Sequence, residues 1–245
     1  TTSCTATACT PPTASISYAT PFCADITSQQ TVTLTGTGAY TGGIFSAPTG
    51  LTIDPSTGTI TPSSSTAGTY TITYTVAPSG GCPGVTATTS VTINALITPT
   101  FNAVAAICNG ATLSALPTTS NNGITGTWSP ALNNISTTTY TFTPTVGQCA
   151  TTTNLQIVVN PILSPTINCG ASTTSSVTFT WAAISGATDY TVSYRINSGA
   201  VVNIGAIGNV LTYQVTGLSG GDNVSITVTP TGGAGTCFSS ATTSC

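Results

Sequence analysis

The chain has 245 residues, with one basic and four acidic side chains, no histidine and a net charge of −3. A single arginine cannot follow a phosphate backbone, so the composition excludes nucleic acid as a partner. With 39% hydrophobic residues the chain can bury cores, unlike a disordered segment. It has no apolar run long enough to predict a membrane-spanning helix.

Alternation of apolar residues with threonine predicts β-strands from one end of the chain to the other. Clear examples are residues 31–35, 70–76 and 91–93. Threonine and valine suit half-buried strands of this kind, and clusters of Gly, Pro, Asn and Ser interrupt them as turns would. No stretch has the helical period. We therefore expect an all-β chain of small antiparallel sandwiches, with strands of five to eight residues.

Prolines divide the chain into blocks at 11–95, 96–161 and 162–245. Residues 1–10 are expected to be the end of a preceding repeat. Thr1–Cys4 reads TTSC, and Thr242–Cys245 reads TTSC again. Self-similarity at a fixed period is typical of repeat proteins. The sequence thus predicts one period of about 241 residues from a longer tandem array, with three modules joined by short Pro-bearing linkers.

Each block carries motifs that resemble a known module type. The first contains GLTIDPSTGTI at 50–60 and TAGTY at 66–70, which resemble the immunoglobulin-like (Ig-like) repeats of bacterial surface proteins. The second, with GTWSP at 126–130 and TYTF at 139–142, is similar to a shorter module of those proteins. The third resembles fibronectin type III domains through residues 177–181, 186–195 and 213–218. These motifs imply a fold and no activity.

The nine cysteines lack the spacings of zinc sites, which points to disulfides and an oxidising, extracellular location. In every block one cysteine follows the first strand and another follows the penultimate strand. A six-strand order would bring the two to one end of each sandwich, which predicts the pairs Cys23–Cys82, Cys108–Cys149 and Cys169–Cys237. Cys4 would pair with Cys9, leaving Cys245 for the next period. The alternative bond Cys169–Cys245 stays open, because spacing does not determine connectivity.

The titratable residues are too few for most catalysis. Asp25, Asp54, Asp189 and Asp222 are the only carboxylates, and no His, Glu or Lys accompanies them. A glycosidase-like pair of Asp25 with Asp54 and a calcium site at either residue are weaker interpretations than turn and capping roles. We expect no enzyme, no cofactor and no metal site. Asp189 is expected to form an ion pair with Arg195, six residues along one strand.

Three further features have a structural and a functional interpretation. Trp128 and Trp181 are expected in cores, with sugar stacking as the alternative. Gly232–Gly235 predicts a hairpin turn, since no helix or lysine follows to make a phosphate loop. The threonine rows could match ice only on long flat strands, and sandwich strands twist. We therefore expect them to serve as an uncharged, soluble outer surface.

Taken together, threonine-rich Ig-like and fibronectin-like modules with many cysteines resemble the giant repeat adhesins that Bacteroidota export by type IX secretion, including those used in gliding motility. The resemblance implies a structural repeat of a cell-surface filament. Its partners would be neighbouring repeats and surface polysaccharide or the substratum. The alternative is a set of spacer or carbohydrate-binding modules of a secreted hydrolase. Self-assembly into a β-fibre is a third hypothesis, because charged residues that protect strand edges are scarce.

Overall fold

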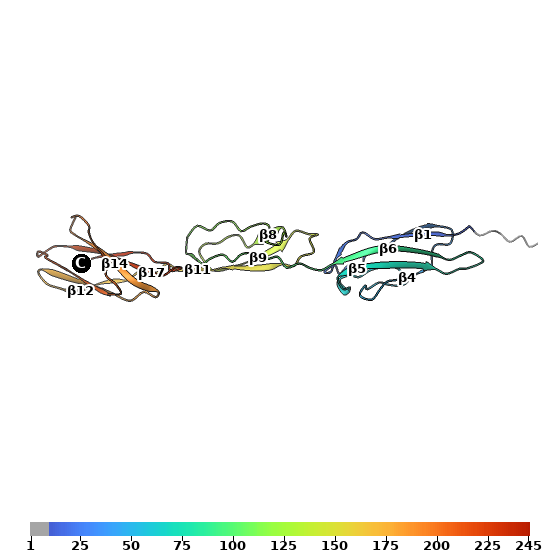
Figure 1. The fold of residues 1–245 in the computed structure, drawn as a ribbon. Helices are drawn as coiled ribbons and strands as arrows, with labels where there is room; N and C mark the ends of the chain where they lie inside the picture. The colour runs from blue at the N-terminus through green and yellow to red at the C-terminus, as the bar shows by residue number, and fades with distance from the viewer. Residues whose placement is uncertain (1–9) are drawn as a thin grey trace, which may run out of the picture. The chain divides into compact units, whose positions relative to one another are not determined.

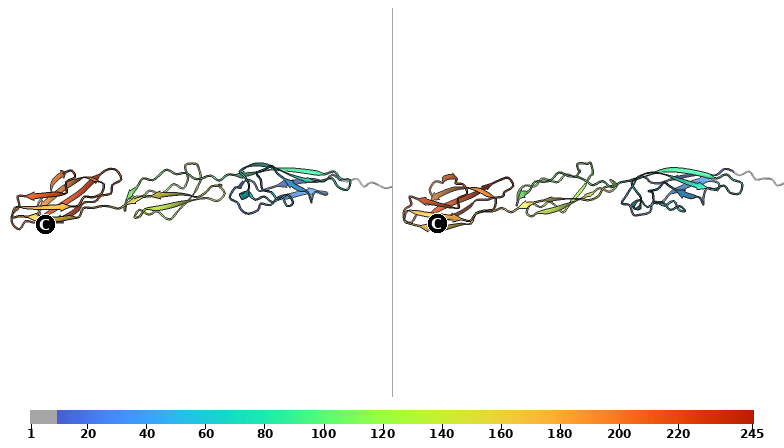
Figure 2. Two further views of the ribbon diagram at one scale, coloured as in Figure 1. Left: turned by 90° about the horizontal axis from the view of Figure 1, so that it is seen from below. Right: turned by 60° about the horizontal axis from the view of Figure 1, so that its bottom comes forward.

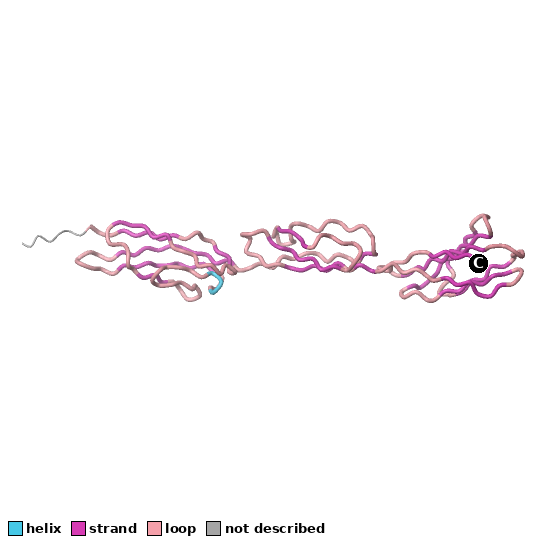
Figure 3. The backbone as a smooth tube through the Cα atoms, turned by 180° about the vertical axis from the view of Figure 1, so that it is seen from behind, coloured by secondary structure: helices cyan, strands magenta, loops and turns pink. Residues whose placement is uncertain are grey.

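A computed structural model describes residues 10–245. Apart from one 3₁₀ turn, η1 (Pro62–Ser64), every regular element in this part of the chain is a β-strand (Figures 1 and 3). Within the same residues, no helix is long and apolar enough to cross a membrane. The chain divides into two compact units: unit 1 runs to Phe101 and adds Thr118–Thr127 and Phe142–Thr153, and unit 2 holds the rest.

The first module of unit 1 is a sandwich of two sheets. Strand β1 (Thr13–Ser17) pairs with β3 (Thr33–Thr37), and the second sheet has the order β2 (Phe22–Cys23), β6 (Val85–Asn94), β5 (Gly68–Val76), β4 (Ile44–Ser46). The alternating pattern sends one set of side chains inward. Between the sheets lies a core that includes Ile16, Phe22, Phe45, Ile60, Ile72, Tyr74, Val91 and Ile93.

The strands of residues 96–161 are divided between the two units. A three-stranded sheet has the order β10 (Thr153–Ile157), β9 (Thr138–Pro144), β8 (Gly126–Ser129), and β7 (Ile107–Cys108) pairs in parallel with β11 (Val159–Asn160). The strands here are short. Tyr140, Phe142 and Ile157 are fully buried among them.

The C-terminal part of unit 2 is a seven-stranded sandwich (Figure 2). One sheet has the order β12 (Ile167–Ser172), β13 (Ser176–Trp181), β16 (Thr212–Thr216). The other has the order β15 (Val202–Ala206), β14 (Ala187–Ile196), β17 (Val224–Gly232), β18 (Ala241–Ser244). Phe179, Tyr190, Val192, Val215, Ile226 and Val228 form its core.

The expected all-β class is confirmed, and two details differ from expectation. Strands β5, β6, β14 and β17 have nine or ten residues, longer than the expected range. Trp181 is buried as expected, at 4% exposure. Trp128 is only half-buried, and its indole N–H donates a hydrogen bond to the carbonyl of Pro117 at 2.9 Å. The module boundaries at 95 and 161 stay a prediction.

Candidate functional site: disulfide-closed junctions

None of the three preferred cysteine pairs forms, but the alternative bond Cys169–Cys245 does. Three bonds join described residues: Cys23–Cys149, Cys108–Cys237 and Cys169–Cys245, with sequence separations of 126, 129 and 76 residues. The expected pairs Cys23–Cys82, Cys108–Cys149 and Cys169–Cys237 are therefore wrong. Two of the observed bonds connect one predicted module to the next.

The expected pair Cys169–Cys237 failed because it assumed six strands in its module. The C-terminal sandwich has seven. Cys169 lies on its first strand and lines one hollow with Cys245 and the loop at Ser219–Asp222. Cys237, in the turn before the last strand, lines a different hollow with Leu163 and Phe238. The two cysteines thus lie at different ends of the sandwich, where no bond can join them.

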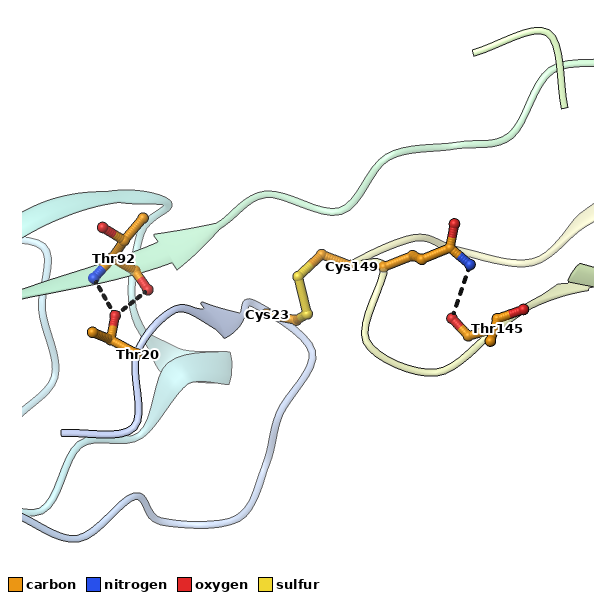
Figure 4. The surroundings of a disulfide bond; sticks show 6 residues. Thr20, Cys23, Thr92, Thr145 and Cys149 are labelled. Carbon is orange, nitrogen blue, oxygen red and sulfur yellow. Dashed lines mark hydrogen bonds between the residues drawn. A yellow bond between two sulfur atoms is a disulfide. The ribbon is translucent and has the colours of Figure 1, made fainter. Parts of the chain in front are cut away.

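The first junction comprises residues 20–24, 92–98 and 148–151, all within unit 1. Here β2 pairs in parallel with the end of β6, placing Cys23 opposite Asn94. The amide of Ala24 donates to the carbonyl of Asn94 at 3.0 Å, which continues the pairing by one residue. Cys23 then reaches Cys149 with a Cα–Cα distance of 5.0 Å (Figure 4).

Three residues after Asn94, the chain pairs with the residues around Cys149. The amide of Ile97 donates to the carbonyl of Cys149 at 2.8 Å, and the amide of Thr151 donates to the carbonyl of Ile97 at 2.9 Å. Cys149 adopts the left-handed conformation, with φ 48. The backbone linker and the disulfide therefore run side by side across this junction.

The second junction comprises residues 107–109, 159–163 and 235–239, all within unit 2. Strand β7 pairs in parallel with β11, so that Cys108 lies opposite Asn160. The side chain of Asn160 also donates to the carbonyl of Gly235 at 3.2 Å. Cys108 is bonded to Cys237 across a Cα–Cα distance of 5.5 Å.

The two junctions share their backbone hydrogen bonds one for one. In the second, the amide of Asn109 donates to the carbonyl of Asn160 at 2.9 Å, as Ala24 does to Asn94. The amide of Leu163 donates to the carbonyl of Cys237 at 2.8 Å, and the amide of Ser239 donates to that of Leu163 at 3.0 Å. A single construction therefore occurs twice.

A short sequence repeat marks this construction, and the sequence analysis missed it. Residues 94–99 read NALITP and residues 160–165 read NPILSP. In both, the asparagine ends a strand and the fourth residue, Ile97 or Leu163, pairs beside the cysteine of the following turn. Motif resemblance to whole modules did not reveal it, since the repeat lies between modules.

The third bond closes the C-terminal sandwich. Cys245 follows β18 and exchanges two backbone hydrogen bonds with Val224, at 2.8 and 2.9 Å. Its sulfur is bonded to Cys169 of β12, so this bond joins the two sheets. Cys82 is disulfide-bonded as well. The expected bond between Cys4 and Cys9 lies outside the described residues.

The carboxylates serve turns. The carboxylate of Asp54 accepts hydrogen bonds from the amides of Ser56 and Thr57, both at 2.8 Å, and these bonds lower its pKa. Asp222 accepts from the amide of Ser219 and from Asn197, which lowers the pKa of this carboxyl. Asp25 lines a hollow beside the first junction, of about 360 Å³.

The expected ion pair between Asp189 and Arg195 does not form. Both lie on β14, where six residues span about 20 Å at the rise of a strand. Sharing a face does not bring them into contact. The carboxylate of Asp189 instead accepts a hydrogen bond from the amide of Tyr190 at 2.7 Å.

The remaining features singled out in the sequence are a possible metal group, the glycine-rich segment and the threonine rows. Among residues 10–245, no group of three His, Cys, Asp or Glu side chains could hold a metal ion. Gly233 and Thr236 form a turn between β17 and β18, as expected for a hairpin. Threonine hydroxyls bond to each other across strands, as in Thr69–Thr92 at 3.0 Å and Thr227–Thr242 at 2.8 Å.

Comparison with known proteins gives structural likenesses alone. No protein-family model and no curated protein sequence matches the chain. It is similar to a domain segment of titin at 13% identity, covering 88% of this chain and 92% of that one, with a TM-score of 0.30. Chicken CNTN1 FN1–FN3 matches at 11% identity, covering 96% and 98%, with a TM-score of 0.29. A two-domain segment of chicken tenascin matches at 14%, covering 82% and 99%, with a TM-score of 0.29.

Proposed function

We propose that this chain is a structural repeat unit of a long extracellular filament and carries out no catalysis. The observation that supports this most directly is the repeated junction. At each one, a backbone linker and a disulfide cross together from one predicted module to the next. A second covalent link restricts bending and twisting of the linker. Such restriction serves a stalk that must hold its modules in line, and it has no evident use in an enzyme.

The cysteines and composition support a location outside the cell. Disulfides persist in oxidising environments, and sandwich modules are common in cell-surface proteins. With one arginine and no lysine, the chain offers trypsin-like proteases almost nothing to cleave. Its surface instead bears neutral hydroxyl groups. These properties suit a fibre exposed to changing salt and to proteases.

The filament we propose is an adhesin that resembles the flavobacterial gliding-motility adhesin SprB. It would be exported by type IX secretion and would bind surface polysaccharide or the substratum. Neighbouring repeats of the same chain would be its direct contacts. The threonine-rich Ig-like and fibronectin-like modules support this proposal, together with the junction cysteines.

Immunogold electron microscopy of the source cells tests the proposal. Antibodies raised against residues 10–245 are expected to label thin filaments outside the cell at regular intervals. Antibodies absorbed with the purified chain are the control and should label nothing. Label confined to the cytoplasm would overturn the proposal. Label on compact secreted particles with hydrolase activity would support the alternative of spacer modules.

A further inference from the structure

We propose that the disulfides give this chain a short covalent path for tension, one that excludes most of its backbone. Under load, a chain can lengthen only by the slack in the shortest covalent route between its ends. Each disulfide closes a loop and removes that loop from the route. The three bonds here enclose loops that overlap, so the route must be traced bond by bond.

The shortest route uses the first and third bonds. It runs from Thr10 to Cys23, crosses to Cys149, follows the backbone to Cys169, and crosses to Cys245. These two backbone stretches contain about 33 residues together, whereas the whole backbone from Thr10 contains about 235. At ~3.5 Å per residue, the fully extended route would measure about 120 Å and the fully extended backbone about 820 Å.

About half of this route already lies in extended strands of the folded chain. From Cys149 to Cys169 it follows β10, β11 and the start of β12, and before Cys23 it follows β1 and β2. A strand rises about 3.3 Å per residue, close to the limit of about 3.3–3.6 Å for a fully extended chain. Tension therefore finds slack only in the residues between these strands, and unfolding a module cannot lengthen the molecule beyond the limit of this route.

The bond Cys108–Cys237 lies on a longer, parallel route. That route returns from Cys149 to Cys108 through the middle of the chain and then crosses to Cys237. It becomes the shortest route when the bond Cys169–Cys245 is absent, and the bond Cys108–Cys237 also lies on the shortest route when Cys23–Cys149 is absent. The three bonds therefore differ in mechanical role, although each closes a loop of 76 residues or more. This difference distinguishes the proposal from general stabilisation by disulfides.

Single-molecule force spectroscopy tests this ranking. The full chain is held by peptide tags at its two ends, in a background where Cys4, Cys9 and Cys82 are serine, so that only the three bonds contribute. Peptide mapping by mass spectrometry first establishes that each sample contains its intended bonds. The readout is the maximum extension relative to this oxidised background chain.

Four results are expected. Removing the first bond by Cys23→Ser with Cys149→Ser should lengthen the fully extended chain by about 250 Å at ~3.5 Å per residue. Removing the third by Cys169→Ser with Cys245→Ser should lengthen it by about 100 Å. Removing the second by Cys108→Ser with Cys237→Ser should leave it unchanged. Full reduction should lengthen it by about 700 Å.

The matched control is the second-bond variant. It deletes a disulfide with a separation of 129 residues, as large as the first, yet should not change the extension. Equal lengthening by all three double variants would overturn the proposal. So would stepwise unfolding of several hundred ångströms in the oxidised background chain. The test needs no cell, so it can fail while the adhesin proposal stands, and the reverse also holds.

Discussion

The hydroxyl of Thr20 is bonded to both backbone groups of Thr92. The amide of Thr92 donates to this hydroxyl at 2.9 Å, and the hydroxyl donates to the Thr92 carbonyl at 3.5 Å (Figure 4). Pro21 follows and has no N–H to offer. A side chain thus supplies the pairing where the backbone of β2 approaches β6. It holds the residues just before Cys23.

We predict that Thr20→Val destabilises the first module by about 1 kcal/mol, the usual net contribution of a hydrogen bond. Valine keeps the shape of threonine and removes both bonds. Urea unfolding of the oxidised chain measures the effect. The control is Thr35→Val, at an exposed position of β3 whose side chain makes no hydrogen bond among the described residues. Equal effects of the two substitutions would contradict the prediction.

The sequence was sufficient to predict the strands but not the connections between cysteines. Alternation places Ile72 and Tyr74 in the core because their side chains point to one face of β5. The alternation of apolar and polar residues contains no information on which sheet edge lies beside which module. The pairing of Cys23 with Cys149 depends on where Ile97 docks, and that is a contact between segments about 50 residues apart. Periodicity operates within a strand and cannot report it.

A buried aromatic ring should make Gly58 irreplaceable. Gly58 has φ +71, and a Cβ added there would lie 2.8 Å from the ring of Phe45. Gly58→Ala would combine backbone strain with overpacking, for a loss of about 2–4 kcal/mol. Gly80→Ala is the matched control, because Gly80 has φ +59 and nothing within 4 Å of its added Cβ. It should cost only the backbone strain, about 1 kcal/mol. Denaturant midpoints compare the two.

Stability should be nearly flat from about pH 5 to pH 9, since the chain has no histidine. Burial raises the pKa of Tyr18 to about 12, and its hydroxyl donates to the carbonyl of Gly58 at 2.7 Å. Because this folded pKa is raised, the stabilisation is complete below the unfolded value of about 10 and is lost as pH rises from there toward about 12.

The substitution Tyr18→Phe should therefore reduce the alkaline loss of stability. Burial, with a smaller effect of Tyr194, also raises the pKa of Tyr213, so some alkaline dependence should remain. At the acid end the sign reverses. The pKa values of Asp54 and Asp222 are lowered, so their contribution is present above about pH 4 and is lost as pH falls further. Melting temperatures measured from pH 2 to pH 11.5 report both the acid and the alkaline loss of stability.

Thermal stability should respond strongly to reductant and hardly at all to salt. Removing a native disulfide that closes a long loop typically costs about 2–5 kcal/mol. Here Cys23–Cys149 and Cys108–Cys237, with separations of 126 and 129 residues, are also the disulfides that cross the two junctions. Salt acts by screening charges, and five charged side chains in 245 residues leave little to screen. Calorimetry in low and high salt, with and without reductant, separates the two effects. A melting temperature that shifts by ten degrees with salt, or that ignores complete reduction, would contradict this account of what holds the chain together.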